Sequence, residues 1–482
     1  DADIKKDEYL HRLDEALKVL NNQLAQLKDK LDLAALAQYI FNHVQWVNNV
    51  MPTGMDVNKL FTTANNSGIQ LEQTDILKAF LLKKIITDKA RYEAIWQACE
   101  QMDNYFERNA KQIFVATDWK TIQPETLAQF DARIFLLTDL TDDKVSPLSS
   151  GHDKTNQPTI NNLANDKTGL ADKNDDHTGK INTTEEYGDI VYCRSIISFA
   201  LLLLHAYRIF LHQQGQQDIS GKFHPDRLIK TFEAFFNKAL EEEVKAFLEC
   251  LWQVRYQFDR CVVKWVKQTE DNEQHLTLTN IIFSEKAIQR TPIKATELSA
   301  LQSVSYFTSG HNTQYWLTPL LGWLIEQQAT PTKETLSRLE QIDDSLSLAQ
   351  LTQKEASFVL LQGANPTAKS IDEIITYLIG SKGTGFEHYW FQKLEYLLLK
   401  HQEAYLKGTD PIKLEKYRIT SKNSVEHVYP QNERYGRKLS DDRAYLDAFG
   451  NLVLLSVGQN SAYGNDDVSI KESKFYNKPT ID

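Results

Sequence analysis

Apolar residues recur three and four positions apart along most of this chain, and this spacing decides its fold class. An α-helix turns once every 3.6 residues, so the spacing places the apolar side chains on one helical face. Residues 10–31 follow it throughout, with Leu10, Leu13, Leu17, Leu20, Leu24, Leu27 and Leu31. They predict one long amphipathic helix, which either packs on its own domain or forms the seam of a coiled-coil homodimer.

The same spacing dominates the chain between residues 190 and 410. The apolar positions form helical patterns over residues 196–210, 228–265, 317–327, 335–339, 371–379 and 386–405. We therefore predict a mainly α-helical, multidomain protein with a helical domain over residues 190–410. Stripes such as Phe232, Phe235 and Phe236 are expected in its core rather than on a binding surface.

An acidic segment interrupts the helical pattern. Residues 141–189 contain ten acidic residues, five lysines, no arginine, and no aromatic residue before Tyr187. Such a composition cannot bury enough apolar surface to offset the entropy lost on ordering. We predict a flexible acidic insertion or linker over residues 139–189, which separates a helical region over 1–138 from the domain over 190–410.

The pattern changes again after Pro411. A short β-branched piece at residues 425–428 and an apolar run at 452–457 predict two strands, and residues 469–476 predict a short helix. Strand, loop, strand and helix indicate a ββα domain over residues 411–482. This segment carries eleven Lys/Arg and ten Asp/Glu, a formal charge of +1, so the rest of the chain carries −12. Only this part has lost the acidity that would repel phosphates.

The predicted ββα segment also contains residues suited to phosphodiester hydrolysis. That reaction needs an activated water and stabilisation of the charge on the leaving oxygen. His427 can serve as the general base, and Asn451 can orient its imidazole. Glu426 and Asn460 offer hard oxygen ligands for one Mg²⁺ or Mn²⁺ ion. An isolated Glu-His pair is more often structural, but the full set, with two asparagines nine residues apart, is far more specific.

Three motifs in this segment resemble those of a known nuclease class. They are E-H-V-Y-P-Q at residues 426–431, G-N-L-V-L-L at 450–455 and N-S at 460–461. They are similar to the HNH, or His-Me finger, nucleases, and in particular to the C-terminal domain of the GmrSD-type modification-dependent restriction enzymes. The resemblance implies a ββα-metal endonuclease that acts on modified foreign DNA. Lys471 and Lys474, in the last predicted helix, are candidate DNA contacts.

A second resemblance lies near the start of the chain. Phe61, Asn65, Gly68 and Leu71 have the F-x-x-x-N-x-x-G-x-x-L spacing of the ParB-like N-terminal domain of the same family. The resemblance implies that residues 1–138 are the C-terminal part of a sensor or NTPase domain, with Asn65 and Gly68 at a nucleotide or sensor site. The two residues fit a helix-entry turn equally well. The family's D-G-Q-Q-R element is absent from these 482 residues, so nucleotide hydrolysis is left open.

Composition limits the other possibilities. The formal net charge of −11 argues against a protein that coats nucleic acid through its overall field, although a local basic groove is compatible with it. The cysteines are scattered, which argues against a disulfide scaffold or a cysteine zinc site. Residues 1–6 lack the apolar core of a signal peptide, and the apolar run at 196–204 is too short to span a bilayer. We expect a soluble, cytoplasmic protein that does not enter a membrane.

Two further basic or glycine-rich features have simpler explanations. The G-S-K-G-T-G run at residues 380–385 can cradle a phosphate, but it lacks the P-loop pattern, and a turn between helices is the simpler interpretation. Arg255, Arg260, Lys264 and Lys267 can contact a DNA backbone, but a solvated helix face is the commoner meaning of such a run.

These features together predict a metal-dependent DNA endonuclease or nickase of a restriction system that defends against phage. Two alternatives remain. One is a catalytically inactive DNA-sensing or assembly protein, and the other is an NTP-driven regulator of a defence complex.

Overall fold

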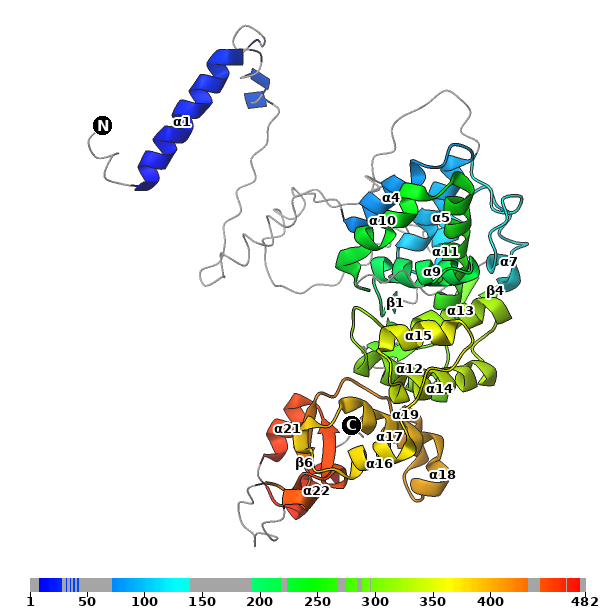
Figure 1. Ribbon diagram of the computed structural model, residues 1–482, viewed down its shortest axis with the longest axis vertical. Coiled ribbons are helices and arrows are strands. Elements are labelled where there is room, and N and C mark those ends of the chain that lie inside the picture. Colours follow the sequence, from blue (N-terminus) through cyan, green and yellow to red (C-terminus); the bar gives the residue numbers. More distant parts are fainter. Residues whose placement is uncertain are drawn as a thin grey trace, which may run out of the picture. The chain divides into compact units, whose positions relative to one another are not determined.

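The structure is a computed structural model that describes residues 8–27, a few positions between 32 and 42, and most of the chain from 72 to 476 (Figure 1). The described ranges beyond residue 71 are 72–138, 193–217, 223–267, 274–283, 288–294, 296–431, 443–464 and 466–476. The chain divides into two compact units, residues 1–70 and 71–482. The acidic segment over 139–189 and the candidate residues Asn65 and Gly68 lie outside the described residues, so the predictions made for them are untested.

The first unit contains the predicted leucine-rich helix. Helix α1 spans Glu8–Leu27, and its described side chains include the exposed Leu17 and Leu20. The helix itself is therefore confirmed. The homodimer seam along it stays a prediction.

The first half of the second unit is a bundle of helices around one apolar core. Residues before and after the acidic segment contribute to the same core, since Leu77, Trp96 and Phe114 are clustered with Leu202 and Trp252. The helices are α4 (Gln73–Leu82), α5 (Lys89–Glu100), α6 (Phe106–Ile113), α7 (Pro124–Leu127), α9 (Phe199–Gln213), α10 (Leu228–Lys238) and α11 (Glu241–Cys261).

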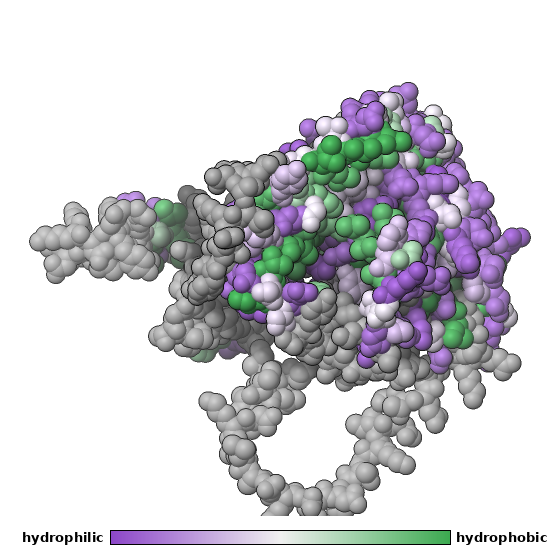
Figure 2. Space-filling view, turned by 90° about the horizontal axis from the view of Figure 1, so that it is seen from below, coloured by the Kyte–Doolittle hydropathy of each residue, from purple (hydrophilic) through white to green (hydrophobic). Residues whose placement is uncertain are grey.

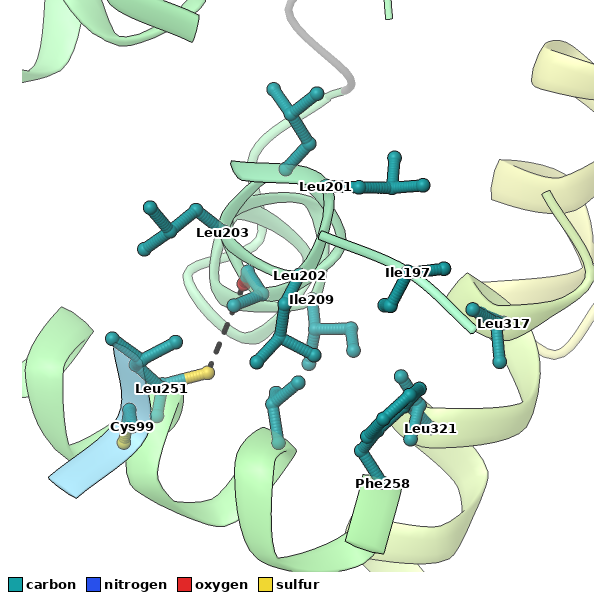
Figure 3. Close-up of a cluster of buried hydrophobic side chains, with 14 of the residues drawn as sticks. Cys99, Ile197, Leu201, Leu202, Leu203, Ile209, Leu251, Phe258, Leu317 and Leu321 are labelled. Atoms are coloured by element: carbon teal, nitrogen blue, oxygen red, sulfur yellow. Dashed lines mark hydrogen bonds between the residues drawn. The ribbon is translucent and has the colours of Figure 1, made fainter. Parts of the chain in front are cut away.

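Helix α9 lies at the centre of this core. It begins where the Ser198 hydroxyl accepts a hydrogen bond from the Leu201 amide, and every residue from 201 to 211 is buried. A helix that is apolar on all sides must be enclosed by others. Figure 3 shows Leu201, Leu203 and Ile209 pointing in different directions from α9, toward the surrounding helices. Among the described residues, no helix is both long and apolar enough to cross a membrane.

Short strands lie before α9 and after α11, in the part of the chain for which the sequence predicted a helical domain. Strands β1 (Cys193–Arg194), β2 (Lys264–Lys267) and β3 (Gln274–Thr277) form an antiparallel sheet in that order, and β4 (Thr279–Phe283) pairs with β5 (Ile288–Pro292). The prediction of an all-helical domain over 190–410 was therefore incomplete. These strands have two to five residues each, which is too short for a periodic signal.

A buried ionic network joins these strands to the helices. The Asp259 carboxylate accepts from Arg255 at 2.6 Å and from Lys264 at 2.8 Å, and Arg290 pairs with Glu107 at 2.7 Å. All five side chains are almost fully buried, and burial lowers the pKa of the Lys264 ammonium. Arg255 and Lys264 therefore do not form the solvated or DNA-contacting helix face that the sequence suggested.

The second half of the unit continues with helices and ends in a small two-stranded sheet. The helices before the sheet are α12 (Glu297–Thr308), α13 (Leu317–Gln327), α14 (Lys333–Leu348), α15 (Gln353–Leu361), α16 (Ile371–Ile379), α17 (His388–Lys400), α18 (Gln402–Tyr405) and α19 (Pro411–Lys416). Strands β6 (Ser424–His427) and β7 (Leu452–Leu455) pair antiparallel, with His427 opposite Leu452. The chain then forms α21 (Val457–Tyr463) and α22 (Val468–Tyr476).

The predicted order of strand, strand and helix is thus observed, and α21 lies between the second strand and the predicted helix. The second strand ends at Leu455 because Ser456 caps α21, its hydroxyl accepting from the Gln459 amide at 3.3 Å. The segment between the strands contains α20 (Arg443–Leu446) and a 3₁₀ turn, η3 (Phe449–Asn451).

The small sheet has its own apolar core. Val425, Leu452 and Leu454 pack there against Phe386 and Phe391, which lie before the predicted domain boundary at residue 411. Helix α16 contributes Tyr377, whose ring meets that of Phe386 at 5.6 Å, while its isoleucines 371, 375 and 379 are exposed. In the view from below, hydrophobic surface lies in separate patches among hydrophilic side chains (Figure 2).

Candidate active site

Strand β6 distributes its residues over two faces. Successive side chains of a strand point to opposite sides, so Val425 and His427 share one face, and Ser424 and Glu426 share the other. Val425 belongs to the small core, and on the other face Glu426 meets Lys471 of α22. Glu426 and His427 are therefore neighbours in sequence that serve different sides of the sheet.

His427 forms a close pair with an aspartate that the sequence analysis did not single out. Its Nε2 lies 2.8 Å from Oδ1 of Asp447, and the Gln431 side-chain nitrogen lies 3.3 Å from the same Nε2. The imidazole is largely buried at 6% exposure. With Nε2 donating to the carboxylate, Nδ1 carries the lone pair, and within the part of the chain that the structure describes no hydrogen bond engages Nδ1.

Asn451 holds the chain segment that follows His427. Its side-chain oxygen accepts from the Tyr429 amide at 2.8 Å. Its side-chain nitrogen donates to the carbonyl oxygens of Tyr429 at 3.2 Å and Leu446 at 2.8 Å. Both amide N–H groups are thus bound to backbone atoms. The predicted direct contact with the imidazole is replaced by a brace between the end of β6 and the residue before Asp447.

Glu426 and Lys471 form an ion pair behind the strand. The Lys471 ammonium donates to Oε1 of Glu426 and to the His427 carbonyl oxygen, both at 2.7 Å, and only 6% of Lys471 is exposed. This buried position does not fit the predicted contact with DNA. Lys474, the other predicted DNA contact, forms an ion pair with Asp466. The Glu426 carboxylate, a predicted metal ligand, already has a cationic partner.

Asn460 lies at the opposite end of β6 from His427. Its side-chain nitrogen donates to the Ser424 hydroxyl at 2.6 Å. Ser424 lies three positions before His427, which corresponds to roughly 10 Å along β6. The structure therefore does not bring Asn460 to the imidazole, although both belong to the predicted catalytic set.

The predicted metal ligands do not converge in this arrangement. Among the described residues, no group of three or more His, Cys, Asp or Glu side chains has the geometry to hold a metal ion. Glu426 is paired with Lys471, and Asn460 is bonded to Ser424. The groups that do converge are His427, Asp447 and Gln431. Asp447 could not be found from spacing, because it lies in the irregular segment between the strands.

Comparison with known families places the C-terminal part of the chain in a class of nucleases, the restriction endonucleases. The family is that of the GmrSD restriction endonucleases, C-terminal domain, and it matches residues 376–481. The matched range contains His427, Asp447, Asn451 and the loop at residues 380–385. The expected resemblance is thus confirmed for the C-terminal domain, whose class implies interaction with DNA. No curated protein and no solved structure matches the chain.

Proposed function

We propose that the chain is an HNH-type DNA endonuclease or nickase of a modification-dependent restriction system, with His427 as its general base. The observation that supports this most directly is the contact between His427 and Asp447, 2.8 Å long, inside the range that matches the restriction endonuclease family. A histidine fixed by a carboxylate on one ring nitrogen can take a proton on the other.

In the proposed reaction, Nδ1 of His427 removes a proton from water, and the oxygen attacks the phosphorus. The bond between phosphorus and the leaving oxygen then breaks. Asp447 accepts the Nε2 hydrogen bond throughout and stabilises the imidazolium that forms. A positioned general base contributes roughly 10²- to 10⁴-fold to such a reaction.

Asn451 and Gln431 support this pair in the proposal. Asn451 binds the backbone of Tyr429, two residues after His427, and the backbone of Leu446, directly before Asp447. It therefore fixes the positions of both segments relative to each other. Gln431, at the end of the segment that Asn451 braces, reaches Oδ1 of Asp447 at 3.4 Å. Asn451 therefore acts as a positioning residue.

The requirement for Mg²⁺ or Mn²⁺ stays a prediction. The described residues do not gather the predicted ligands, so we assign no step to a metal ion. Recognition of modified DNA and use of a nucleoside triphosphate are likewise predictions. The first rests on the resemblance of the whole chain to the restriction family, and the second on the resemblance at residues 61–71.

The test is nicking of supercoiled plasmid by the full chain, with modified and unmodified DNA, and with Mg²⁺ or with EDTA. We expect His427→Ala to abolish nicking. His401→Ala is the matched control, because His401 is an exposed histidine beside α18 and outside the site. Equal nicking by wild type and His427→Ala, or no nicking by wild type in any condition, would refute the proposed function.

A further inference from the structure

The glycine-rich loop at residues 380–385 lies directly against the aspartate that binds His427. The amides of Lys382 and Gly383 donate to the Asp447 carbonyl oxygen at 3.1 and 2.9 Å. Beside them, Ser381 forms an isolated β-bridge with Ala448. These two amides hold protein backbone, so they are not available to cradle a phosphate. The loop connects α16 to α17, more than sixty residues before Asp447 in the sequence.

Gly383 lies so close to the Asp447 side chain that a larger residue at this position would push against the carboxylate. A Cβ atom at this position would lie 2.9 Å from Oδ1 of Asp447 and 3.1 Å from its Cγ. Gly383 also has a φ of +54°, in the left-handed region that side chains disfavour. Gly385, two residues later in the same loop, has nothing within 4 Å of such an atom. The loop thus contains one constrained glycine and one unconstrained glycine.

The Asp447 oxygen that Gly383 approaches is the same oxygen that contacts His427. Oδ1 of Asp447 lies 2.8 Å from Nε2 of His427 and 3.4 Å from the Gln431 side-chain nitrogen. Gly383 therefore bounds this oxygen on one side, and the imidazole bounds it on another. A displacement of a few tenths of an ångström on the Gly383 side changes the length or angle of the bond to His427.

The loop itself is firmly held. The Gly385 amide donates to the Lys382 carbonyl oxygen at 3.0 Å, which closes a tight turn. Phe386 follows at once and is buried with Val425 in the core beneath β6. The loop and the strand that carries His427 are thus anchored in the same apolar cluster, so the loop cannot retreat easily from an added methyl group.

We propose that Gly383 is a positioning residue of the nuclease site, which holds the Asp447 carboxylate in the orientation that fixes His427. The expected effect of a Gly383 substitution on activity rests on the proposed function, whereas its expected effect on stability does not. This positioning role of the loop backbone differs from phosphate binding.

The first experiment compares Gly383→Ala with Gly385→Ala in the full chain, by nicking kinetics over a range of DNA concentrations and pH. We expect Gly383→Ala to lower kcat at least tenfold with little change in KM, and Gly385→Ala to behave as wild type. The fall in kcat should resemble that of Asp447→Asn, because both changes weaken the contact between the carboxylate and the imidazole. The other charged groups near the imidazole, Lys471 and Glu426, are unchanged in these variants.

The second experiment needs no activity. Thermal melting of Gly383→Ala is compared in the wild-type background and in Asp447→Ala, which removes the carboxylate atoms that the new methyl group meets. We expect a clear fall in Tm, or failure to fold, in the first background and a smaller fall in the second, where only the strain of the left-handed φ at residue 383 remains. Equal effects in the two backgrounds, or equal kcat for Gly383→Ala and Gly385→Ala, would overturn the proposal. A wild-type chain that never nicks DNA would instead count against the proposed function and leave the melting comparison valid.

Discussion

Replacement of Asp447 by asparagine removes one negative charge beside the His427 imidazole and leaves the size of the side chain almost unchanged. The carboxylate is 2.8 Å from Nε2, and 27% of its side chain is exposed. For unit charges about 4 Å apart, the interaction is about 4 kcal/mol at an effective dielectric constant of about 20 and about 1 kcal/mol in bulk water. The partial exposure of Asp447 places the loss between these limits, at about 2–3 kcal/mol.

A loss of this size lowers the nicking rate about 30- to 150-fold, because each 1.36 kcal/mol of barrier corresponds to a factor of about ten. The assay is single-turnover nicking of supercoiled plasmid by the full chain, with Asp466→Asn as control, since Asp466 pairs with Lys474 and not with the imidazole. If Asp447→Asn nicks within threefold of wild type while His427→Ala is inactive, the carboxylate does not support the base and the reasoning is wrong.

Three further predictions concern other charged groups. Lys471→Met leaves the Glu426 carboxylate without its buried partner, so unfolding free energy in urea should fall by about 3–5 kcal/mol, and Glu426→Gln in the same chain should recover part of it. Lys382 is exposed beside Gly383, so Lys382→Ala should weaken DNA binding measured by fluorescence anisotropy. The slope of the logarithm of the binding constant against the logarithm of the salt concentration should fall in magnitude by about 1, and an unchanged slope would contradict a phosphate contact. Hydrogen bonds from Thr87 lower the pKa of Glu241 to about 2, so its stabilising effect is present above about pH 4.5 and is lost as the pH falls toward 2. Glu241→Gln should accordingly lower Tm at pH 7 and have no effect at pH 2; a pH-independent difference would refute this.

The helices of this chain could be predicted because their signal is local and repeated. The pattern over residues 196–210 located α9, whereas the single stretch predicted over 228–265 is divided in the structure into α10, α11 and the start of β2. Strand β2 has four residues and follows α11, and β4 has five residues and follows β3, so neither strand is long enough to show a periodic pattern.

The site was predicted in part. The motifs located His427 and the strand that carries it, but they could not show that Asp447 pairs with it, because that contact depends on how an irregular segment folds back. The positions of Glu426 and Lys471 illustrate a second limit. A strand sends adjacent residues to opposite faces, so the predicted strand at 425–428 already implied that Glu426 and His427 diverge. Whether Lys471 faces solvent or Glu426 is a matter of packing, and a lysine in a helix looks the same in the sequence in both cases.

The apolar cluster beneath β6 also limits where the nuclease domain can be separated from the rest of the chain. Phe386 and Phe391 cover Val425, Leu452 and Leu454, and the loop before them touches Asp447. A recombination junction at residue 411 would separate β6 and β7 from Phe386 and Phe391, and it would also remove Gly383 from the site. A junction before α16 would transfer both together. A chimaera that exchanges the region before residue 371 should therefore keep α16, its loop and α17 with the nuclease domain.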